Sequence, residues 1–296
     1  DLSEVKRKWQ WYRTKIIENR TKVKTDDYLT DELSAAGVNY INKQAKDDQH
    51  FMLYLAYNAP HTPLQATEKY LSRFPKITDK KRKTYAAMVS AVDDGVGRIL
   101  EALKEKGLDE NTIVVFLSDN GGAHNNASDN GPLRGLKGDL FEGGIRVPFA
   151  MRWKGTIPEG NSYKKPISSL DIMATIVAQS NVKIDPNRPL DGVNLIPFLT
   201  GAEIGAPHDY LFWRKWEQNA MAIRHGNYKL IANKQKQKAS PNLYNLSKDK
   251  NERIEIGFEK KKISKQLHRK WQEWNSEMKD RIFPTLGQDE WWKEKK

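Results

Sequence analysis

The sequence predicts an α/β protein built on a doubly wound, mainly parallel sheet flanked by helices, with a small antiparallel sheet and a packed helix at its C-terminal end. Residues 113–117 are an apolar, largely β-branched run, which is typical of a strand buried on both faces. A long amphipathic helical pattern at residues 84–106 precedes this run, as in a βαβ unit. Beyond residue 203, three short apolar runs joined by short turns indicate antiparallel pairing.

The first half of the chain is expected to alternate strands and helices. Residues 12–24 favour two short strands around a turn at Asn19 and Arg20. Thr30 is the predicted N-cap of a helix over residues 31–45, which carries acidic residues in its first turn. Residues 51–57 are predicted to form an apolar strand. Gly107 is expected to end the helix over residues 84–106, and a strand over residues 112–117 follows.

The second half begins with a predicted strand at residues 147–151 and a helix that Ser169 or Asp171 caps and that ends near Gln179. Residues 185–201 are rich in Pro, Gly and Asp, which indicates a surface connection. We therefore predict two domains, residues 1–203 and 204–296. In the second we expect strands at 221–224, 228–233 and 243–246 and a helix over 259–279. The tryptophans at 291 and 292 are expected to fold back or to bind carbohydrate.

Composition excludes several classes of protein. A chain of 296 residues with 38% hydrophobic residues can bury a sizeable core. No apolar run approaches the length of a membrane span, and the first residues lack the apolar region of a signal peptide. Because the chain begins with Asp, we expect a processed or truncated product. The absence of cysteine excludes disulfides, thiolate zinc sites and a cysteine nucleophile within these residues.

The charge balance favours a polyanionic partner. The chain has 50 basic and 38 acidic residues, a formal net charge of +12, and the excess is concentrated beyond residue 224. Sulfated polysaccharide fits such a surface, although a solvated lysine-rich face explains the same composition. The basic residues form no recognised nucleic-acid module, so nucleic acid is not an expected partner.

Polar side chains with the chemistry of a binding site follow two predicted strands. Asp119 and Asn120 come directly after the strand over residues 112–117, at the edge where open α/β sheets bind ligands. Their oxygens suit Ca²⁺ or Mg²⁺, although turn chemistry alone also explains these residue types. Lys137, between two glycines, is a cationic donor suited to a tetrahedral oxyanion. His61 lies between two prolines at the end of the strand over residues 51–57.

A series of motifs identifies a resemblance. In order along the chain these are YLTD at 28–31, APHTP at 59–63, SDNG at 118–121, LRGLKG at 133–138, EGGIRVP at 142–148, DGV at 191–193, AIRHGNYKL at 222–230 and LYNL at 243–246. Their order and spacing resemble the C-terminal half to two-thirds of a type I sulfatase, in the alkaline-phosphatase-like superfamily. The resemblance implies that the α/β part is the C-terminal portion of the sulfatase catalytic domain, followed by a small C-terminal subdomain.

The resemblance also implies a reaction. In such enzymes a formylglycine hydrate, made from Cys or Ser, attacks the sulfur of a sulfate ester beside a divalent cation, usually Ca²⁺ and possibly Mg²⁺. Matching positions make Asp119 and Asn120 metal ligands. Lys137 would bind a sulfate oxygen, and His61 would hydrogen-bond the sulfate or assist the leaving oxygen.

Further positions match the family pattern with supporting roles. Glu142 and Arg146 are expected to support the site from behind it, since the two glycines between them indicate tight packing. His124 and Arg134 lie near enough in sequence to contact the sugar or the sulfate. Loops around residues 125–132 and 213–216 are expected to recognise the sugar.

One part of the family pattern is absent from this sequence. No Cys/Ser-x-Pro-x-Arg motif, the source of formylglycine, occurs in it. We therefore expect a missing N-terminal segment to supply the nucleophile and the remaining metal ligands, and the chain alone to be inactive. The alternatives are a non-catalytic fragment that binds sulfated glycan and a phosphoryl or phosphonate hydrolase of the same superfamily. The resemblance implies a periplasmic or extracellular protein acting on an anionic sulfated carbohydrate.

Overall fold

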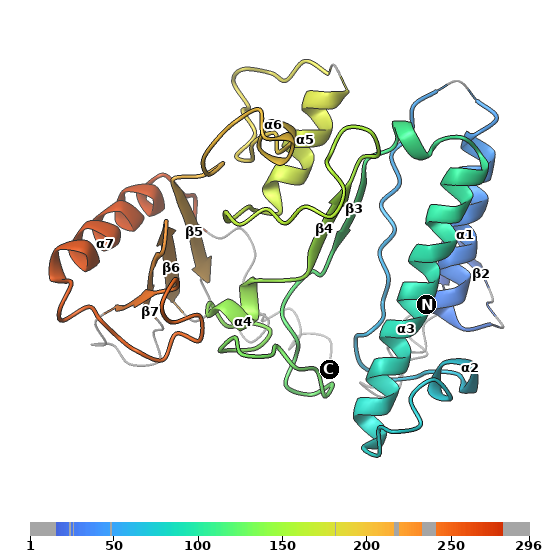
Figure 1. The fold of residues 1–296 in the computed structure, drawn as a ribbon, viewed down its shortest axis with the longest axis horizontal. Coiled ribbons are helices and arrows are strands. Elements are labelled where there is room, and N and C mark those ends of the chain that lie inside the picture. The colour runs from blue at the N-terminus through green and yellow to red at the C-terminus, as the bar shows by residue number, and fades with distance from the viewer. Residues whose placement is uncertain are drawn as a thin grey trace, which may run out of the picture. The chain divides into compact units, whose positions relative to one another are not determined.

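The computed structural model in Figure 1 describes residues 16–23, 25, 27–47, 49–180, 182–215, 219–232 and 241–280. The chain forms two compact units, and each is described by itself. The first comprises Asp1–Val114 and Ala123–Asp129, and the second comprises Val115–Gly122 and Asn130–Lys296. The division into sequence domains near residue 203 stays a prediction.

The first unit begins with a hairpin of β1 (Ile16–Glu18) and β2 (Thr21–Val23), which pair antiparallel as predicted. Asn19 turns this hairpin with a φ of 54°, a left-handed conformation that asparagine tolerates. The helices that follow are α1 (Leu29–Gln44), α2 (Glu68–Leu71) and α3 (Lys80–Glu105), with a 3₁₀ turn at Asp109–Asn111.

Helices α1 and α3 lie side by side (Figure 1), and apolar residues from both form the core of the first unit. Ile41 of α1 and Ala102 and Leu103 of α3 are buried together, with Phe51 and Leu53 against them. The expected core stripe of the long helix is therefore confirmed where it faces α1. Two residues beyond α2, Arg73 forms an ion pair with Asp94 of α3, at 2.7 Å.

The helix starts differ from the sequence prediction. Thr30 is not an N-cap, because α1 begins at Leu29 and the Thr30 side chain is buried inside the first turn. Helix α3 begins four residues before the predicted start. There the Asp79 carboxylate accepts the backbone N–H of Arg82 at 2.7 Å, an N-cap that the following run of basic residues obscured. Gly107 ends the helix with a φ of 68°, as predicted.

Residues 51–57 are not a strand, contrary to the prediction. The segment is extended with alternating side chains, but within the described residues it has no strand partner. One face packs on the helices through Phe51 and Leu53, while Met52 and Tyr54 are 57% and 85% exposed. The alternating pattern correctly predicted an extended backbone, but a strand also needs a hydrogen-bonded neighbour.

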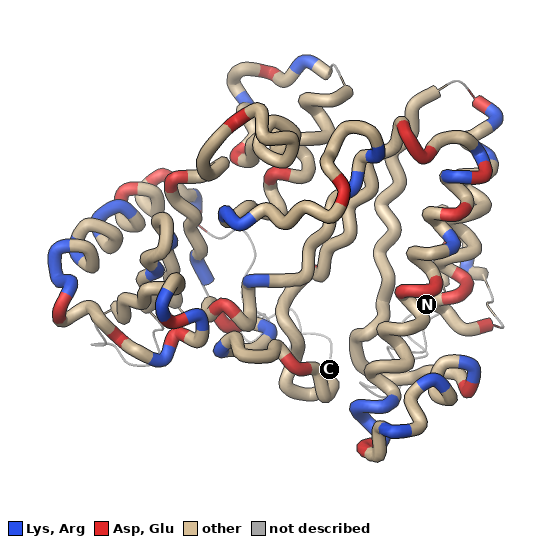
Figure 2. Tube along the Cα trace, in the orientation of Figure 1, with Lys and Arg blue, Asp and Glu red and all other residues tan. Residues whose placement is uncertain are grey.

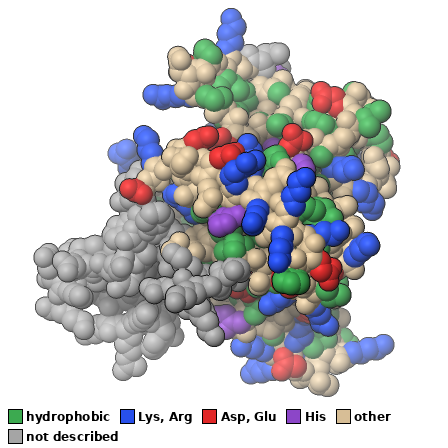
Figure 3. Space-filling model, turned by 90° about the vertical axis from the view of Figure 1, so that its left-hand side faces the viewer, with side chains coloured by type: hydrophobic (Ala, Val, Ile, Leu, Met, Phe, Trp, Pro, Cys, Tyr) green, Lys and Arg blue, Asp and Glu red, His purple; other side chains and the backbone are tan. Residues whose placement is uncertain are grey.

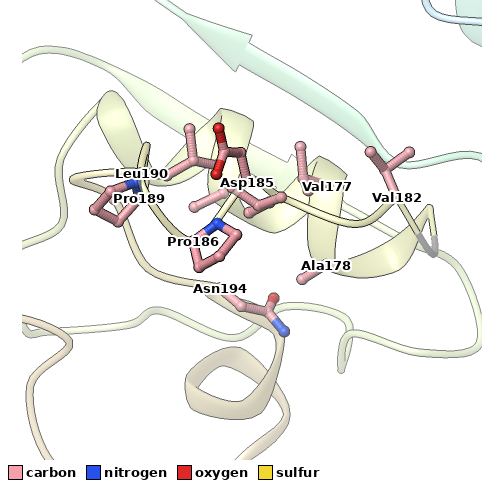
Figure 4. Close-up of a pocket in the computed structure, with 11 residues that line it drawn as sticks. Val177, Ala178, Val182, Asp185, Pro186, Pro189, Leu190 and Asn194 are labelled. Carbon is pink, nitrogen blue, oxygen red and sulfur yellow. The ribbon is translucent and has the colours of Figure 1, made fainter.

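Strand β3 (Val114–Leu117), which belongs to the second unit from Val115 onward, pairs with β4 (Phe149–Arg152). Each of the two strands begins two residues after its predicted start. The short helix α4 (Glu142–Ile145) precedes β4, and α5 (Leu170–Gln179) follows it after an N-cap at Ser169. The predicted surface connection contains a short helix, α6 (Ile196–Thr200), which the sequence analysis missed. An open groove of about 530 Å³ lies between α5 and residues 182–194, with a mostly apolar lining (Figure 4).

The second unit ends in an antiparallel sheet of four strands in sequence order: β5 (Tyr210–Lys215), β6 (Ala220–His225), β7 (Tyr228–Ala232) and β8 (Asn242–Asn245). Three of these strands were predicted. The sequence analysis missed β5 and took Trp213 for part of a sugar-binding loop, whereas Trp213 lies in β5 and packs on the buried core. The tryptophans at 291 and 292 lie outside the described residues.

Helix α7 (Lys261–Ser276) covers one face of this sheet, as expected. Its buried Leu267 packs against Ile223, Leu230 and Leu243 of the sheet, and the opposite face packs on Leu140 and Phe141. The α/β class predicted from the sequence is confirmed. Of the helices that the structure describes, none has both the length and the apolar character that a membrane crossing requires.

Candidate active site

The predicted metal-binding residues lie directly beyond β3. The backbone N–H of Ser118 donates to Pro148 O at 3.1 Å, which places the start of the SDNG motif beside β4. Asp119 is exposed, and among the described residues its carboxylate makes no hydrogen bond or ion pair. The Asn120 amide nitrogen donates to Gly121 O at 3.0 Å. The arrangement leaves the carboxylate oxygens and the amide oxygen of this pair available to a ligand.

Glycines hold this turn against the EGG motif. Gly121 donates its N–H to Gly144 O at 3.0 Å, and Gly143 donates to Arg134 O at 2.7 Å. A Cβ on Gly121 would lie 2.8 Å from the carbonyl carbon of Gly143 and would overlap the carbonyl oxygen. We call the three interlocked segments, residues 119–122, 134–138 and 142–144, the cradle. Its backbones approach so closely that a side chain does not fit at these glycines.

Lys137 belongs to the same cradle. Its backbone N–H donates to Gly122 O at 2.9 Å. The side chain of Asn130 joins the same two segments, since it accepts from Gly122 N–H at 2.8 Å and donates to Gly135 O at 2.9 Å. The Lys137 side chain itself is exposed. Its ammonium group is therefore carried on a loop whose backbone is fixed to the Asp119–Asn120 turn.

A buried charge cluster lies behind the cradle and joins it to the C-terminal sheet. Glu142 is buried, and its Oε1 lies 2.8 Å from Lys229 Nζ on β7. Lys229, at 0% exposure, also lies 2.9 Å from Glu252 Oε1. The guanidinium groups of Arg224 and Arg146 lie 3.6 and 3.8 Å from Glu142 Oε2. The predicted role of Glu142 and Arg146 in supporting the site stays a prediction.

Burial shifts the ionisation of two members of this cluster. Desolvation raises the pKa of the Glu252 carboxyl, and the positive charge of Lys229 opposes that rise. Desolvation lowers the pKa of Arg224, and the negative charge of Glu142 opposes that change. Both groups are held in surroundings that disfavour charge, so the charged form of each is stabilised by its oppositely charged partner.

Arg134 is tied to the same cluster. Its Nη1 donates to Glu252 O at 2.7 Å, and its guanidinium carbon lies 3.9 Å from the centre of the Phe141 ring. These contacts occupy one side of the guanidinium group with structural partners. Its predicted contact with the sugar or sulfate stays a prediction.

The two candidate histidines belong to the first unit. His61 is exposed, and its Nδ1 lies 2.6 Å from Thr62 O. Because a carbonyl oxygen only accepts, Nδ1 carries the proton and Nε2 is the remaining polar atom of the neutral ring. His124 is exposed in residues 123–129, where Arg82 Nη1 donates to Ala127 O at 2.8 Å. Six predicted site residues thus lie together in the second unit, and two lie in the first.

Sequence reasoning missed Lys229 and Glu252. A usable signal existed for Lys229, because alternation in YKLIA places it on the same face as Ile231, a core residue. A lysine in that position requires a buried anion. No comparable signal marks Glu252, which has a φ of 52° in an irregular loop.

The α/β fold and the cradle define a class of protein that presents oxygen ligands and a cationic donor beyond the end of a strand. The family pattern described as "Sulfatase" matches residues 5–182, and the pattern described as "N-sulphoglucosamine sulphohydrolase, C-terminal" matches residues 137–277. The chain belongs to the sulfatase family.

Several relatives support this assignment. An uncharacterized sulfatase of Escherichia coli (strain K12), YdeN, is 38% identical over 201 residues, which are 67% of this chain and 36% of that protein. The N-acetylgalactosamine-6-sulfatase of Canis lupus familiaris is 30% identical, over 76% of this chain and 42% of its own length. The crystal structure of Ps i-CgsB in complex with k-i-k-neocarrahexaose matches with a TM-score of 0.83 and 38% identity, over 89% of this chain and 58% of that one. The chain spans less than half the length of these two curated relatives.

Proposed function

We propose that this chain forms one side of the active site of an enzyme that hydrolyses sulfate esters of a sulfated carbohydrate. The observation that carries the proposal is the cradle, which fixes the backbones of Asp119, Asn120 and Lys137 to one another, while the side chains of Asp119 and Lys137 are exposed and that of Asn120 is half-buried. Oxygen ligands and a cationic donor on one rigid support suit a sulfate group beside a cation. Membership of the sulfatase family supports the same reaction.

The donor set fits a hard divalent cation, Ca²⁺ or Mg²⁺. A carboxylate and an amide oxygen are the ligand types that such ions take, and the glycine cradle keeps other side chains away from the turn. Ca²⁺ takes six to eight oxygen ligands, so Asp119 and Asn120 would be part of a larger shell. When bound, such a cation polarises the sulfate group and stabilises the diol of a formylglycine residue.

The residues of this chain have separate tasks in the proposed reaction. Asp119 and Asn120 hold the cation. Lys137 donates to a sulfate oxygen and stabilises the negative charge that shifts onto it in the transition state. His61 presents Nε2 for a hydrogen bond to the sulfate or for proton transfer to the leaving oxygen.

The formylglycine nucleophile and the remaining ligands would come from polypeptide that precedes this chain in the whole protein. The extended segment at residues 51–57 supports such a partner, because it has exposed Met52 and Tyr54 on one face and no strand neighbour among the described residues. A strand from the preceding polypeptide would complete the pairing along the edge of this segment, and a helix of that polypeptide would cover the face with Met52 and Tyr54. We propose a periplasmic or extracellular location, in keeping with an extracellular sulfated glycan as substrate.

The substrate is proposed to be an anionic glycan. The relatives include an N-acetylgalactosamine-6-sulfatase, and the solved structure of Ps i-CgsB is a complex with k-i-k-neocarrahexaose. Figure 2 shows basic residues at several positions along α7. In Figure 3 the basic side chains are spread over the visible face with acidic ones between them. A distributed positive surface of this kind attracts a polyanion without fixing one orientation.

The test is sulfate release by the whole protein from a sulfated oligosaccharide and from an aryl sulfate, with and without a chelator. Lys137→Ala should lower kcat by at least about 100-fold while glycan binding is largely retained. Lys265→Ala removes the same charge from an exposed position on α7 and should leave kcat unchanged. Metal-dependent hydrolysis by residues 1–296 alone would contradict the proposed division of the site.

The same experiment, extended to the matched aryl phosphate and to a phosphonate monoester, separates the two alternatives. A non-catalytic glycan-binding protein would bind the oligosaccharide with no turnover for Lys137→Ala to remove. A phosphoryl or phosphonate hydrolase would prefer the matched aryl phosphate or phosphonate monoester to the aryl sulfate.

The proposed docking face has a test of its own. Tyr54 is 85% exposed in the described structure, so its replacement by Ser would change stability by no more than about 0.5 kcal/mol if the face stayed open. In the whole protein we expect Tyr54→Ser to destabilise by about 2 kcal/mol or more, because the covered ring would lose its apolar contacts. The control is Phe258→Ser, at a residue 79% exposed in the second unit. Equal, small effects of Tyr54→Ser and Phe258→Ser on the stability of the whole protein would argue against polypeptide docked on this face.

A further inference from the structure

The charge cluster behind the cradle is buried. Lys229 and Glu252 have no exposed surface, and Glu142 has almost none. Removing charged groups from water is costly, and an apolar cluster of the same shape is often as stable as a buried ion pair. Unlike apolar contacts, the hydrogen bonds and ion pairs of these three residues are directional, so they fix the geometry of the groups that they join.

The geometry is transmitted to the cradle through the backbone. Glu252 Oε2 accepts the backbone N–H of Glu142 at 2.6 Å, while Lys229 holds the Glu142 carboxylate at 2.8 Å. The main chain and the side chain of Glu142 are therefore fixed by the C-terminal sheet and its following loop. The next residues, Gly143 and Gly144, are those that interlock with Arg134 and Gly121.

The path from Lys229 to the proposed ligands is short and continuous. Glu142 sets the position of Gly143 and Gly144, and Gly144 O accepts the N–H of Gly121 at 3.0 Å. Asn120 directly precedes Gly121. Between Glu142 and the turn this path consists of backbone and hydrogen bonds between backbone groups.

We propose that Lys229, held by Glu252, is a positioning residue that sets the geometry of Asp119 and Asn120 from the C-terminal sheet. This inference rests on the proposed function, because it assigns Lys229 a role in holding the proposed cation. Residues that orient metal ligands from behind typically change metal affinity about 10- to 100-fold when they are replaced. Lys229 does not contact the substrate or the cation.

The test is direct titration of the whole protein with Ca²⁺ by isothermal titration calorimetry, below the unfolding temperature of each variant. Lys229→Met keeps an unbranched side chain that is one atom shorter and removes the charged ammonium group. We expect it to weaken Ca²⁺ binding about 10- to 100-fold with the stoichiometry unchanged in the folded protein. Irreversible loss of folded protein has a different signature, because it lowers the stoichiometry. Reversible unfolding weakens the apparent affinity only by the folded fraction, which is close to one well below the unfolding temperature.

Asp171→Asn is the matched control. Asp171 is also a fully buried carboxylate of the second unit, and it accepts from Ser168 N–H and Val193 N–H and lies 2.8 Å from His208 Nε2. None of these contacts involves the cradle. We expect this variant to lower the unfolding temperature while Ca²⁺ affinity is unchanged.

Three outcomes decide the inference. Equal Ca²⁺ affinities for Lys229→Met and the parent protein would overturn it, and so would equal losses in Lys229→Met and Asp171→Asn. If Lys229→Met does not fold, Glu252→Gln decides, because Gln can still accept the Glu142 N–H while the charge on Lys229 loses one partner. It should weaken Ca²⁺ binding several-fold, and an unchanged affinity would again overturn the inference. A parent protein that binds no Ca²⁺ would contradict the proposed function instead.

Discussion

The close contact at Gly121 leads to a prediction that tests the cradle itself. Replacing Gly121 with Ala adds one methyl group, whose carbon would lie 2.8 Å from the carbonyl carbon of Gly143 and 3.0 Å from Gly144 Cα. Carbon atoms pack at about 3.5–4.0 Å, and the atoms in the way are backbone rather than a movable side chain. Either the SDNG turn or the EGG segment must therefore move.

The cost of this movement can be estimated from its parts. Overpacking a close contact costs about 1–3 kcal/mol. The displaced backbones also lose or lengthen the Gly121–Gly144 and Gly143–Arg134 hydrogen bonds, each worth about 1 kcal/mol. The sum is a destabilisation of about 3–5 kcal/mol. At about 2 °C per kcal/mol for a chain of this length, Tm should fall by about 6–10 °C.

The assay is urea unfolding followed by tryptophan fluorescence, with thermal unfolding as a second measurement. Gly97→Ala is the matched control, because Gly97 lies within α3 and a Cβ there would meet no atom within 4 Å. That variant should be stabilised by about 0.5–1 kcal/mol, since alanine is the better helix former. A free energy of unfolding for Gly121→Ala within about 1 kcal/mol of the parent would refute the claim that the cradle is rigid.

Three further predictions, at Leu267, Asp79 and Glu252, test other parts of the fold by unfolding measurements. Leu267→Ala, in the α7 core, should cost about 2–5 kcal/mol, whereas Phe258→Ala, at an exposed ring, should change stability by no more than about 0.5 kcal/mol. Asp79→Ala should cost about 1 kcal/mol through loss of the α3 N-cap, and Asp79→Asn should restore most of it. Burial raises the pKa of the Glu252 carboxyl in the folded protein above its value of about 4.3 in the unfolded chain. The contribution of this group to the free energy of unfolding is therefore fully present below pH about 4.3 and is lost as pH rises through the folded pKa. Glu252→Gln should remove this fall from the pH profile of the unfolding free energy; an unchanged profile would contradict the assignment.

Features set by neighbouring residues could be predicted from the sequence. The hairpin around Asn19 and the end of α3 at Gly107 depend on backbone conformations that these residues favour locally. Strands β6, β7 and β8 follow from apolar runs separated by short polar segments. The candidate site residues Asp119, Asn120 and Lys137 were proposed because their types and glycine neighbours are informative without a structure.

Features set by distant residues could not be predicted. The segment at 51–57 alternates like a strand, but whether it pairs depends on chain that is far away or outside the described residues. Strand β5 is different, because its aromatic residues favour a strand and the sequence analysis missed it; the structure shows it paired with β6. The burial of Lys229 depends on two carboxylates that lie 87 and 23 positions away in the sequence.

The role of the cradle glycines also depends on a segment that is distant in the sequence. In the structure Gly121 faces the carbonyl group of Gly143, so its lack of a side chain serves contact with another segment of the protein. Rigidity at the proposed metal ligands therefore comes from backbone packing, and the buried charges at Glu142 fix that packing to the C-terminal sheet. A substitution far from the ligands, on β7, can thus act on the site without altering any group that contacts the substrate.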